Sequence, residues 1–138
     1  MSKDHHKGNV LLLRTACVTL IIGLILAWCL VFTKLLKIPF MVALFQHPEN
    51  LLSSHLDFLM MTMLLLGFYA SKINLPKYVQ WPMAIGSITN PGLFLVAAIM
   101  GNDLVPFVML LVVLSFVLTT FGYVMGAIKF LRYSLRQA

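Results

Sequence analysis

The sequence has little charge and no polar stretch long enough to fold as a soluble domain. Only 10% of its 138 residues are charged, 61% are hydrophobic, and the mean hydropathy is +0.97. A soluble domain of this length carries charge on about a quarter of its residues, so this composition excludes one. We therefore predict an all-α integral membrane protein with a single domain over residues 1–138.

Cysteine is also scarce, and metal-binding motifs are absent. Cys17 and Cys29 are the two cysteines, and about 18 Å of helical rise separates them, which excludes an intrachain disulfide and suggests packing roles. The hydrophobic part has no Cys-x-x-Cys, no His-x-x-x-His and no paired carboxylates. A tetrahedral zinc site needs three or four such ligands, so hydrolytic zinc chemistry is not expected.

Long hydrophobic runs occupy most of the chain. A membrane-spanning helix needs roughly 20 apolar residues. No small-residue cleavage pattern follows the first run, so we expect it to be a permanent helix and not a signal peptide. The sequence predicts a multi-pass four-helix bundle with spans near Thr15–Phe32, Leu51–Ser71, Tyr78–Asn102 and Leu104–Ile128.

The connection between the first two spans is itself rather apolar. Residues 38–45 contain bulky hydrophobic groups and a single proline, so we expect this segment to lie in the membrane interface or to dip into it. Pro48 and Glu49 are typical of the first turn of a helix, because proline needs no donor there and a carboxylate complements the positive helix end. The second helix is thus predicted to start near His47.

The net charge of +6 comes from basic residues that gather on one side of the predicted membrane topology. Cytoplasmic loops of membrane proteins are rich in Lys and Arg, so the pattern predicts that both termini are cytoplasmic and gives no reason to expect a nucleic-acid partner. The predicted cytoplasmic segments hold eight of the ten basic residues: Lys3, Lys7, Arg14, Lys72, Lys77, Lys129, Arg132 and Arg136.

His55 and Asp57 are the histidine and the carboxylate that fall inside the predicted spans. Ionisable groups at that depth are costly and usually mark a ligand, ion or proton site. The two residues lie about 200° apart around a helix, so they serve different faces. Two readings of Asp57 stay open: Ser54 and Asp57 fit a capping box, or Asp57 lies inside a helix that starts at Pro48 and needs a donor.

A lone histidine in a bundle is often only hydrogen-bonded, but neutral imidazole is also a common ligand of haem iron. Haem can be held through one axial ligand, and a single histidine leaves the sixth position open, which favours ligand chemistry over electron transfer. His47 lies about 12 Å away along the same helix and could ligate only from another subunit or from a loop that folds back.

The third span has small, polar and helix-breaking residues at its middle. Pro91 removes a backbone hydrogen bond and predicts a kink, and Asn90 needs partners in an apolar environment. Small residues here allow close helix packing, and a pocket wall that faces the second span is the alternative.

The pair Ser54-His55 at the start of the second helix and the segment Ser87-Ile88-Thr89-Asn90-Pro91-Gly92-Leu93-Phe94 resemble the styrene oxide isomerases, which are small four-helix membrane enzymes. The resemblance covers residues 45–99 of 138. It implies a location in a bacterial inner membrane and a homotrimer with haem b between subunits. It also implies that His55 is the single axial iron ligand. In that family ferric haem acts as a Lewis acid that converts a small apolar epoxide into an aldehyde.

The resemblance also implies a substrate pocket, in which this chain keeps one polar residue and lacks three. Asn90 matches a family asparagine and is the expected catalytic residue. Phe94 stands where the family has tyrosine, Met61 where it has asparagine, and Gly86 close to the place of an aspartate. A phenyl or thioether group cannot donate a hydrogen bond to an oxygenated substrate, so these departures put the isomerase reaction in doubt while haem binding could persist.

Two other classes of function remain open. A non-catalytic subunit of a larger membrane complex would explain the short loops and the lack of a catalytic cluster. A small proton-coupled transporter has a similar size, but it needs a carboxylate in the first helix, where this chain has none. Asp57 would have to take that role.

Overall fold

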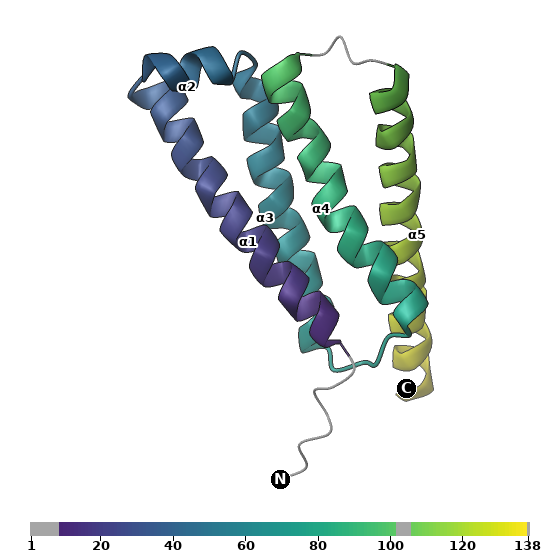
Figure 1. Cartoon of the computed structure of the whole chain (residues 1–138). Coiled ribbons are helices and arrows are strands. Elements are labelled where there is room, and N and C mark those ends of the chain that lie inside the picture. The colour runs from purple at the N-terminus through teal and green to yellow at the C-terminus, as the bar shows by residue number, and fades with distance from the viewer. Residues whose placement is uncertain (1–8, 102–105, 138) are drawn as a thin grey trace.

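The computed structural model describes residues 9–101 and 106–137, and it consists of helices (Figure 1). The elements in chain order are α1 (Val10–Leu30), the π-helical turn η1 (Val31–Leu35), the short helix α2 (Pro39–Leu44), α3 (Pro48–Ala70), α4 (Lys77–Met100) and α5 (Pro106–Gln137). In the described part of the chain, four helices are long and apolar enough to span a membrane. The predicted all-α, four-helix architecture is confirmed.

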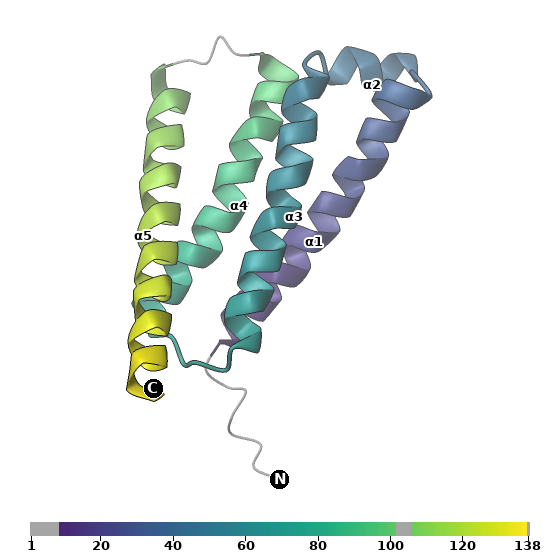
Figure 2. The same cartoon turned by 180° about the vertical axis from the view of Figure 1, so that it is seen from behind.

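The long helices alternate in direction, so that α1 begins and α5 ends at the same end of the bundle (Figures 1 and 2). We call this the termini end. Helix α3 packs against α1 on one side and α4 on the other, and α5 packs mainly against α4. At the opposite end, α2 lies across the bundle between α1 and α3.

The helix boundaries agree with the sequence in some places and differ in others. Helix α3 begins at Pro48, as predicted, so Asp57 lies well inside it and the capping-box reading of Asp57 is wrong. Helix α5 continues to Gln137, beyond the predicted end at Ile128, because the basic residues that end the apolar run are good helix formers. The predicted ends Asn102 and Leu104 lie outside the described residues.

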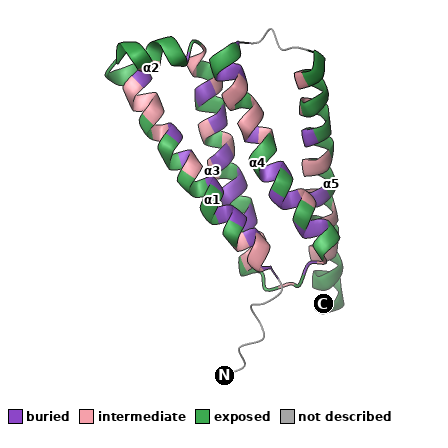
Figure 3. Ribbon diagram, viewed as in Figure 1, coloured by how far each residue is buried: buried purple, intermediate pink, exposed green. Residues whose placement is uncertain are grey.

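Exposed positions follow the long helices (Figure 3), and many of them are apolar. Large apolar side chains cover the outside, among them Ile21, Leu24, Trp28, Met63, Phe107 and Val117. Polar side chains fill positions inside, among them Thr15, Thr19, Ser54, Thr62, Gln80, Ser87 and Ser115. This distribution is typical of helices that meet lipid outside and join through small and polar residues inside.

Two apolar clusters form the interior. The cluster nearer the termini end joins α1, α3 and α4, and Phe68 and Tyr123 pack against it. The cluster nearer the other end contains Leu26, Phe58 and Ala98, and Phe45 from the segment that follows α2 closes it. Between the clusters, the Thr19 and Thr62 hydroxyls hydrogen-bond across α1 and α3 at 2.8 Å.

Small residues let α4 and α5 approach closely. A Cβ added to Gly86 of α4 would lie 2.8 Å from Thr119 Cα of α5 and closer still to the Thr119 hydroxyl. A Cβ added to Gly122 would lie 2.7 Å from the Met83 backbone nitrogen. Close packing of this kind is the main source of helix association in lipid, so it holds α5 on the bundle.

Asn9 links the start of α1 to the α3–α4 loop through hydrogen bonds. Its Nδ2 donates to the Ile73 carbonyl at 2.7 Å, and its Oδ1 accepts from the Leu75 amide at 3.1 Å and from Gln80 Nε2 at 3.4 Å. Because Asn9 is buried, these bonds satisfy a side chain that would otherwise be costly to desolvate. They fix the loop that precedes α4.

Candidate functional site

His55 lies on the face of α3 that packs on α1. Its ring is half-buried, and Nδ1 lies 2.8 Å from the carbonyl oxygen of Gly23. Gly23 is buried, and a Cβ at that position would come within 3.1 Å of the Leu59 side chain, so the glycine lets the two helices approach at this level. The α1–α3 contact therefore holds the imidazole in a fixed orientation.

The Gly23 bond determines which imidazole nitrogen carries the proton. A backbone carbonyl oxygen only accepts, so Nδ1 must be the donor. In the neutral ring this leaves a lone pair on Nε2, and Nε2 has no hydrogen-bond partner within residues 9–101 and 106–137. A histidine whose one nitrogen donates to a backbone carbonyl while the other is free has the usual arrangement of a metal-ligating imidazole.

His47, the residue before α3, has different partners from His55. It precedes α3, its Nδ1 lies 3.2 Å from Glu49 Oε1, and its backbone amide donates to the Ala98 carbonyl at 3.2 Å. Gly101 packs on its ring, since a Cβ there would lie 3.0 Å from His47 Nε2. His47 thus joins the start of α3 to the end of α4.

Asp57 lies on the other face of α3, as the helical spacing predicts. Asn90 of α4 donates from Nδ2 to Asp57 Oδ2 at 2.9 Å, and both residues are half-buried. One turn before Asp57, the buried Ser54 hydroxyl donates to the Pro91 carbonyl at 2.8 Å. Asn90 and the Pro91 carbonyl of α4 therefore face α3, as the pocket-wall reading expects, and Asp57 and Asn90 supply each other's partner. The Ser87 and Thr89 hydroxyls instead hydrogen-bond to Tyr123 and Ser115 of α5, each at 2.7 Å.

A cavity of about 190 Å³ opens beside Asn90, between α3, α4 and α5. Phe94, one turn after Asn90, lines it, and Asn50 of α3 supplies a second amide. The remaining lining is apolar: Leu93, Ala97, Met109, Val112 and Phe116. This cavity holds two of the predicted site residues, Asn90 and Phe94.

The other predicted site residues lie elsewhere. Met61 is buried within the bundle, and Gly86 lies under Thr119 of α5, where no side chain would fit. His55 is on the α1 side of α3 and lines none of the hollows described here. One chain therefore does not bring His55, Asn90, Phe94, Met61 and Gly86 into a single site.

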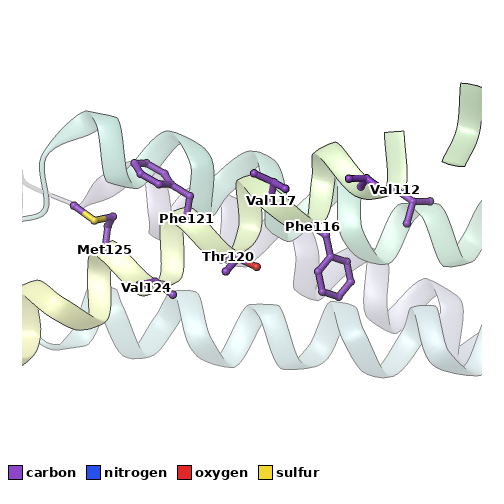
Figure 4. A pocket seen from close by; sticks show the side chains of 8 residues that line it. Val112, Phe116, Val117, Thr120, Phe121, Val124 and Met125 are labelled. Carbon is purple, nitrogen blue, oxygen red and sulfur yellow. The ribbon is translucent and has the colours of Figure 1, made fainter. Parts of the chain in front are cut away.

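A second, larger hollow of about 660 Å³ runs along α5 (Figure 4). Its walls are apolar apart from Thr120, and they include Val112 and Phe116, which also line the cavity beside Asn90. The α5 hollow carries no ionisable group. It can accept an apolar surface but has no chemistry of its own.

Sequence reasoning missed two features of these sites. Asn50 lies seven residues before Asp57, a spacing that places both on one stripe of α3 and could have linked them. Gly122 and Gly126 form a Gly-x-x-x-Gly pattern, a known signal of close helix contact in membranes, and both are buried. Within the described residues, no three His, Cys, Asp or Glu side chains gather as a metal-binding group.

Comparison of the chain with protein-family models, with characterised proteins and with solved structures gave no match. The family resemblance of residues 45–99 therefore remains a prediction from the sequence.

Proposed function

We propose that this chain is an integral membrane protein that binds haem b through Nε2 of His55. The observation that carries the proposal is the 2.8 Å hydrogen bond from His55 Nδ1 to the Gly23 carbonyl. That bond sets the tautomer and the ring orientation that an iron-ligating imidazole needs. The apolar exterior of the four long helices supports insertion in a membrane. The distribution of basic residues supports a cytoplasmic position for both termini.

The donor set fits haem better than it fits a bare metal ion. Haem b brings four nitrogens of its own and supplies iron as a Lewis acid, so one histidine from the protein suffices. His55 is half-buried at the α1–α3 contact, while the apolar hollow lies on α5, which packs mainly against α4. In a head-to-tail ring, such as a trimer, unlike faces of neighbouring copies meet. This fits a porphyrin held between subunits.

The second part of the proposal is an isomerase-like reaction on a small apolar epoxide. Asn90 is the polar group that could orient an oxygenated substrate, and Phe94 gives the cavity an aromatic wall. Because Asn90 Nδ2 already donates one hydrogen to Asp57, one N–H and the carbonyl oxygen remain for a ligand. With Phe94, Met61 and Gly86 lacking donors, the amides of Asn90 and Asn50 would position the substrate. Because one chain keeps this cavity apart from His55, the cavity would have to meet the haem across a subunit boundary.

The absorption spectrum of protein purified from haem-supplied cells tests the first part. We expect a Soret band in the wild type that is lost in His55→Ala and kept in His47→Ala. His47 is the matched control because it lies in the same segment with its own partners. A folded, colourless wild type, or a Soret band unchanged in His55→Ala, would refute haem ligation by His55.

The second part is tested separately. Haem-loaded protein is incubated with several aryl epoxides without reductant, and aldehyde is measured. Formation of aldehyde that is reduced in Asn90→Leu supports the isomerase. If no epoxide reacts while the haem spectrum is intact, the protein is a non-catalytic haem-binding subunit, which also predicts that it purifies with partner proteins.

Proton-coupled transport is the second candidate, and the position of Asp57 favours it. Its carboxylate lies inside a predicted span, and its hydrogen-bond partner Asn90 lines a cavity. Uptake of organic cations into liposomes under a proton gradient tests this reading. Transport must be lost in Asp57→Asn, and transport that survives the change would exclude Asp57 as the coupling group.

A further inference from the structure

A cationic hollow lies at the termini end of the bundle, away from His55 and from the Asn90 cavity. It has a volume of about 330 Å³, and Ile73 and Asn74 of the α3–α4 loop form one side. The C-terminal part of α5 forms the other side with Lys129, Arg132, Tyr133 and Arg136. Three cations thus converge on one concave surface.

These cations have no carboxylate partner within residues 9–101 and 106–137. Within the described residues none of the three forms an ion pair, and the described carboxylates, Glu49 and Asp57, lie in the first half of α3, towards the opposite end. Lys129 Nζ lies 6.0 Å from the centre of the Tyr78 ring, which is a weak partner for a full charge.

The spacing of the cations also matters. Lys129, Arg132 and Arg136 are three and four residues apart, so they share one face of α5 and repel one another. The negative end of the helix dipole offsets part of that repulsion. A bound anion would remove the remainder, and the fork of each guanidinium suits the oxygens of a phosphate.

The position along α5 identifies the source of the phosphate. The inference rests on the membrane insertion proposed above but not on haem. The last apolar run of α5 ends at Ile128, so Lys129 stands where hydrocarbon gives way to headgroups, and Tyr78 and Tyr133 are aromatic residues typical of that depth. Lys129 lies beside Tyr78 of α4, and the exposed side chains Trp81 and Ile85 follow Tyr78 at three and seven residues, so they share its face and offer a surface for acyl chains.

We propose that the cationic hollow formed by Ile73, Asn74, Lys129, Arg132, Tyr133 and Arg136 is a binding site for the headgroup phosphate of an anionic phospholipid. Basic pockets between helices on the cytoplasmic side are a known way to hold such lipids. The headgroup supplies an anion for the three cations, and its chains extend the contact along α4 past Tyr78 and Trp81. A free phosphate would lack that second contact.

The test is native mass spectrometry of the full-length protein with phosphatidylglycerol or phosphatidylcholine. We expect phosphatidylglycerol to bind more tightly. The double variant Arg132→Gln/Arg136→Gln should weaken phosphatidylglycerol binding by about 30-fold, because each interfacial cation contributes a factor of about five. Lys34→Gln/Lys37→Gln is the matched control, since it removes two cations at the opposite end and should leave binding unchanged.

Several results would overturn the proposal. One is equal binding of phosphatidylglycerol and phosphatidylcholine, and another is phosphatidylglycerol binding that does not change in the double variant. The others are an equal loss of binding in the double variant and its control, and full displacement of the lipid by millimolar inorganic phosphate. Should the double variant fail to fold, wild-type protein at high salt replaces it. Phosphatidylglycerol binding must then fall selectively because salt screens the cations, and salt-insensitive binding would count against the site. Membrane insertion is measured separately, as incorporation of the wild-type protein into phosphatidylcholine vesicles. Failure to incorporate would refute the membrane assignment.

Discussion

Substitution of Gly86 by alanine tests whether this residue is a packing position and not part of a pocket. The added methyl would meet the Thr119 hydroxyl and lie 2.8 Å from Thr119 Cα. The Thr119 side chain cannot easily move away, since its hydroxyl donates to the Ser115 carbonyl at 2.7 Å. Relief therefore requires α4 and α5 to separate, and forced overpacking of this kind costs about 1–3 kcal/mol.

Gly92→Ala is the matched control on the same helix, because a Cβ at Gly92 meets nothing within 4 Å. Both variants gain the same helix propensity, about 1 kcal/mol, so that contribution cancels in the comparison. We expect Gly86→Ala to be less stable than Gly92→Ala by about 1–3 kcal/mol. Unfolding in mixed micelles with increasing dodecyl sulfate, followed by the fluorescence of the two tryptophans, measures the difference. Equal stability of the two variants would refute the close α4–α5 contact.

Three further predictions concern other contacts. A double-mutant cycle with Thr19→Val and Thr62→Val should give a coupling free energy of about 0.6 kcal/mol, up to about 1.7, and zero coupling would contradict the hydroxyl pair at 2.8 Å. Asn90→Leu should destabilise by about 1–3 kcal/mol because it leaves the Asp57 carboxylate without its donor, whereas adding Asp57→Leu should restore most of the loss in the same unfolding assay. Gly101→Ala should cost about 1–3 kcal/mol, since φ is 82° and His47 lies against the site, and a neutral result would argue against that backbone conformation.

Much of the fold follows from the sequence because apolar run length and helix-start chemistry are local properties. Pro48 fixes a backbone angle suited to a first turn, so the start of α3 was predictable. The opposite faces of His55 and Asp57 follow from 3.6 residues per turn alone. The predicted end of the last helix, at Ile128, was wrong. The loss of hydrophobicity at Lys129 marks the end of an apolar run and not the end of a helix.

The partners of the polar residues were not predictable in the same way. Which side chain of α4 meets Asp57 depends on the rotation and axial shift of two helices, and those are set by close contacts such as Gly86 on Thr119. The Gly23 carbonyl beside His55 carries no signal in the residue pattern, because any residue has a carbonyl. Only the three-dimensional packing of α1 on α3 brings that acceptor to the imidazole.

The haem content of the purified protein tests the central claim most directly. Pyridine haemochrome analysis gives moles of haem b per mole of chain for wild type and for His55→Ala, both produced with excess haem and shown to be helical by circular dichroism. Ligation by His55 Nε2 predicts haem that co-purifies in a fixed ratio with the wild type and is almost absent from the variant. A helical wild type without haem, or the same haem content in both proteins, would contradict it.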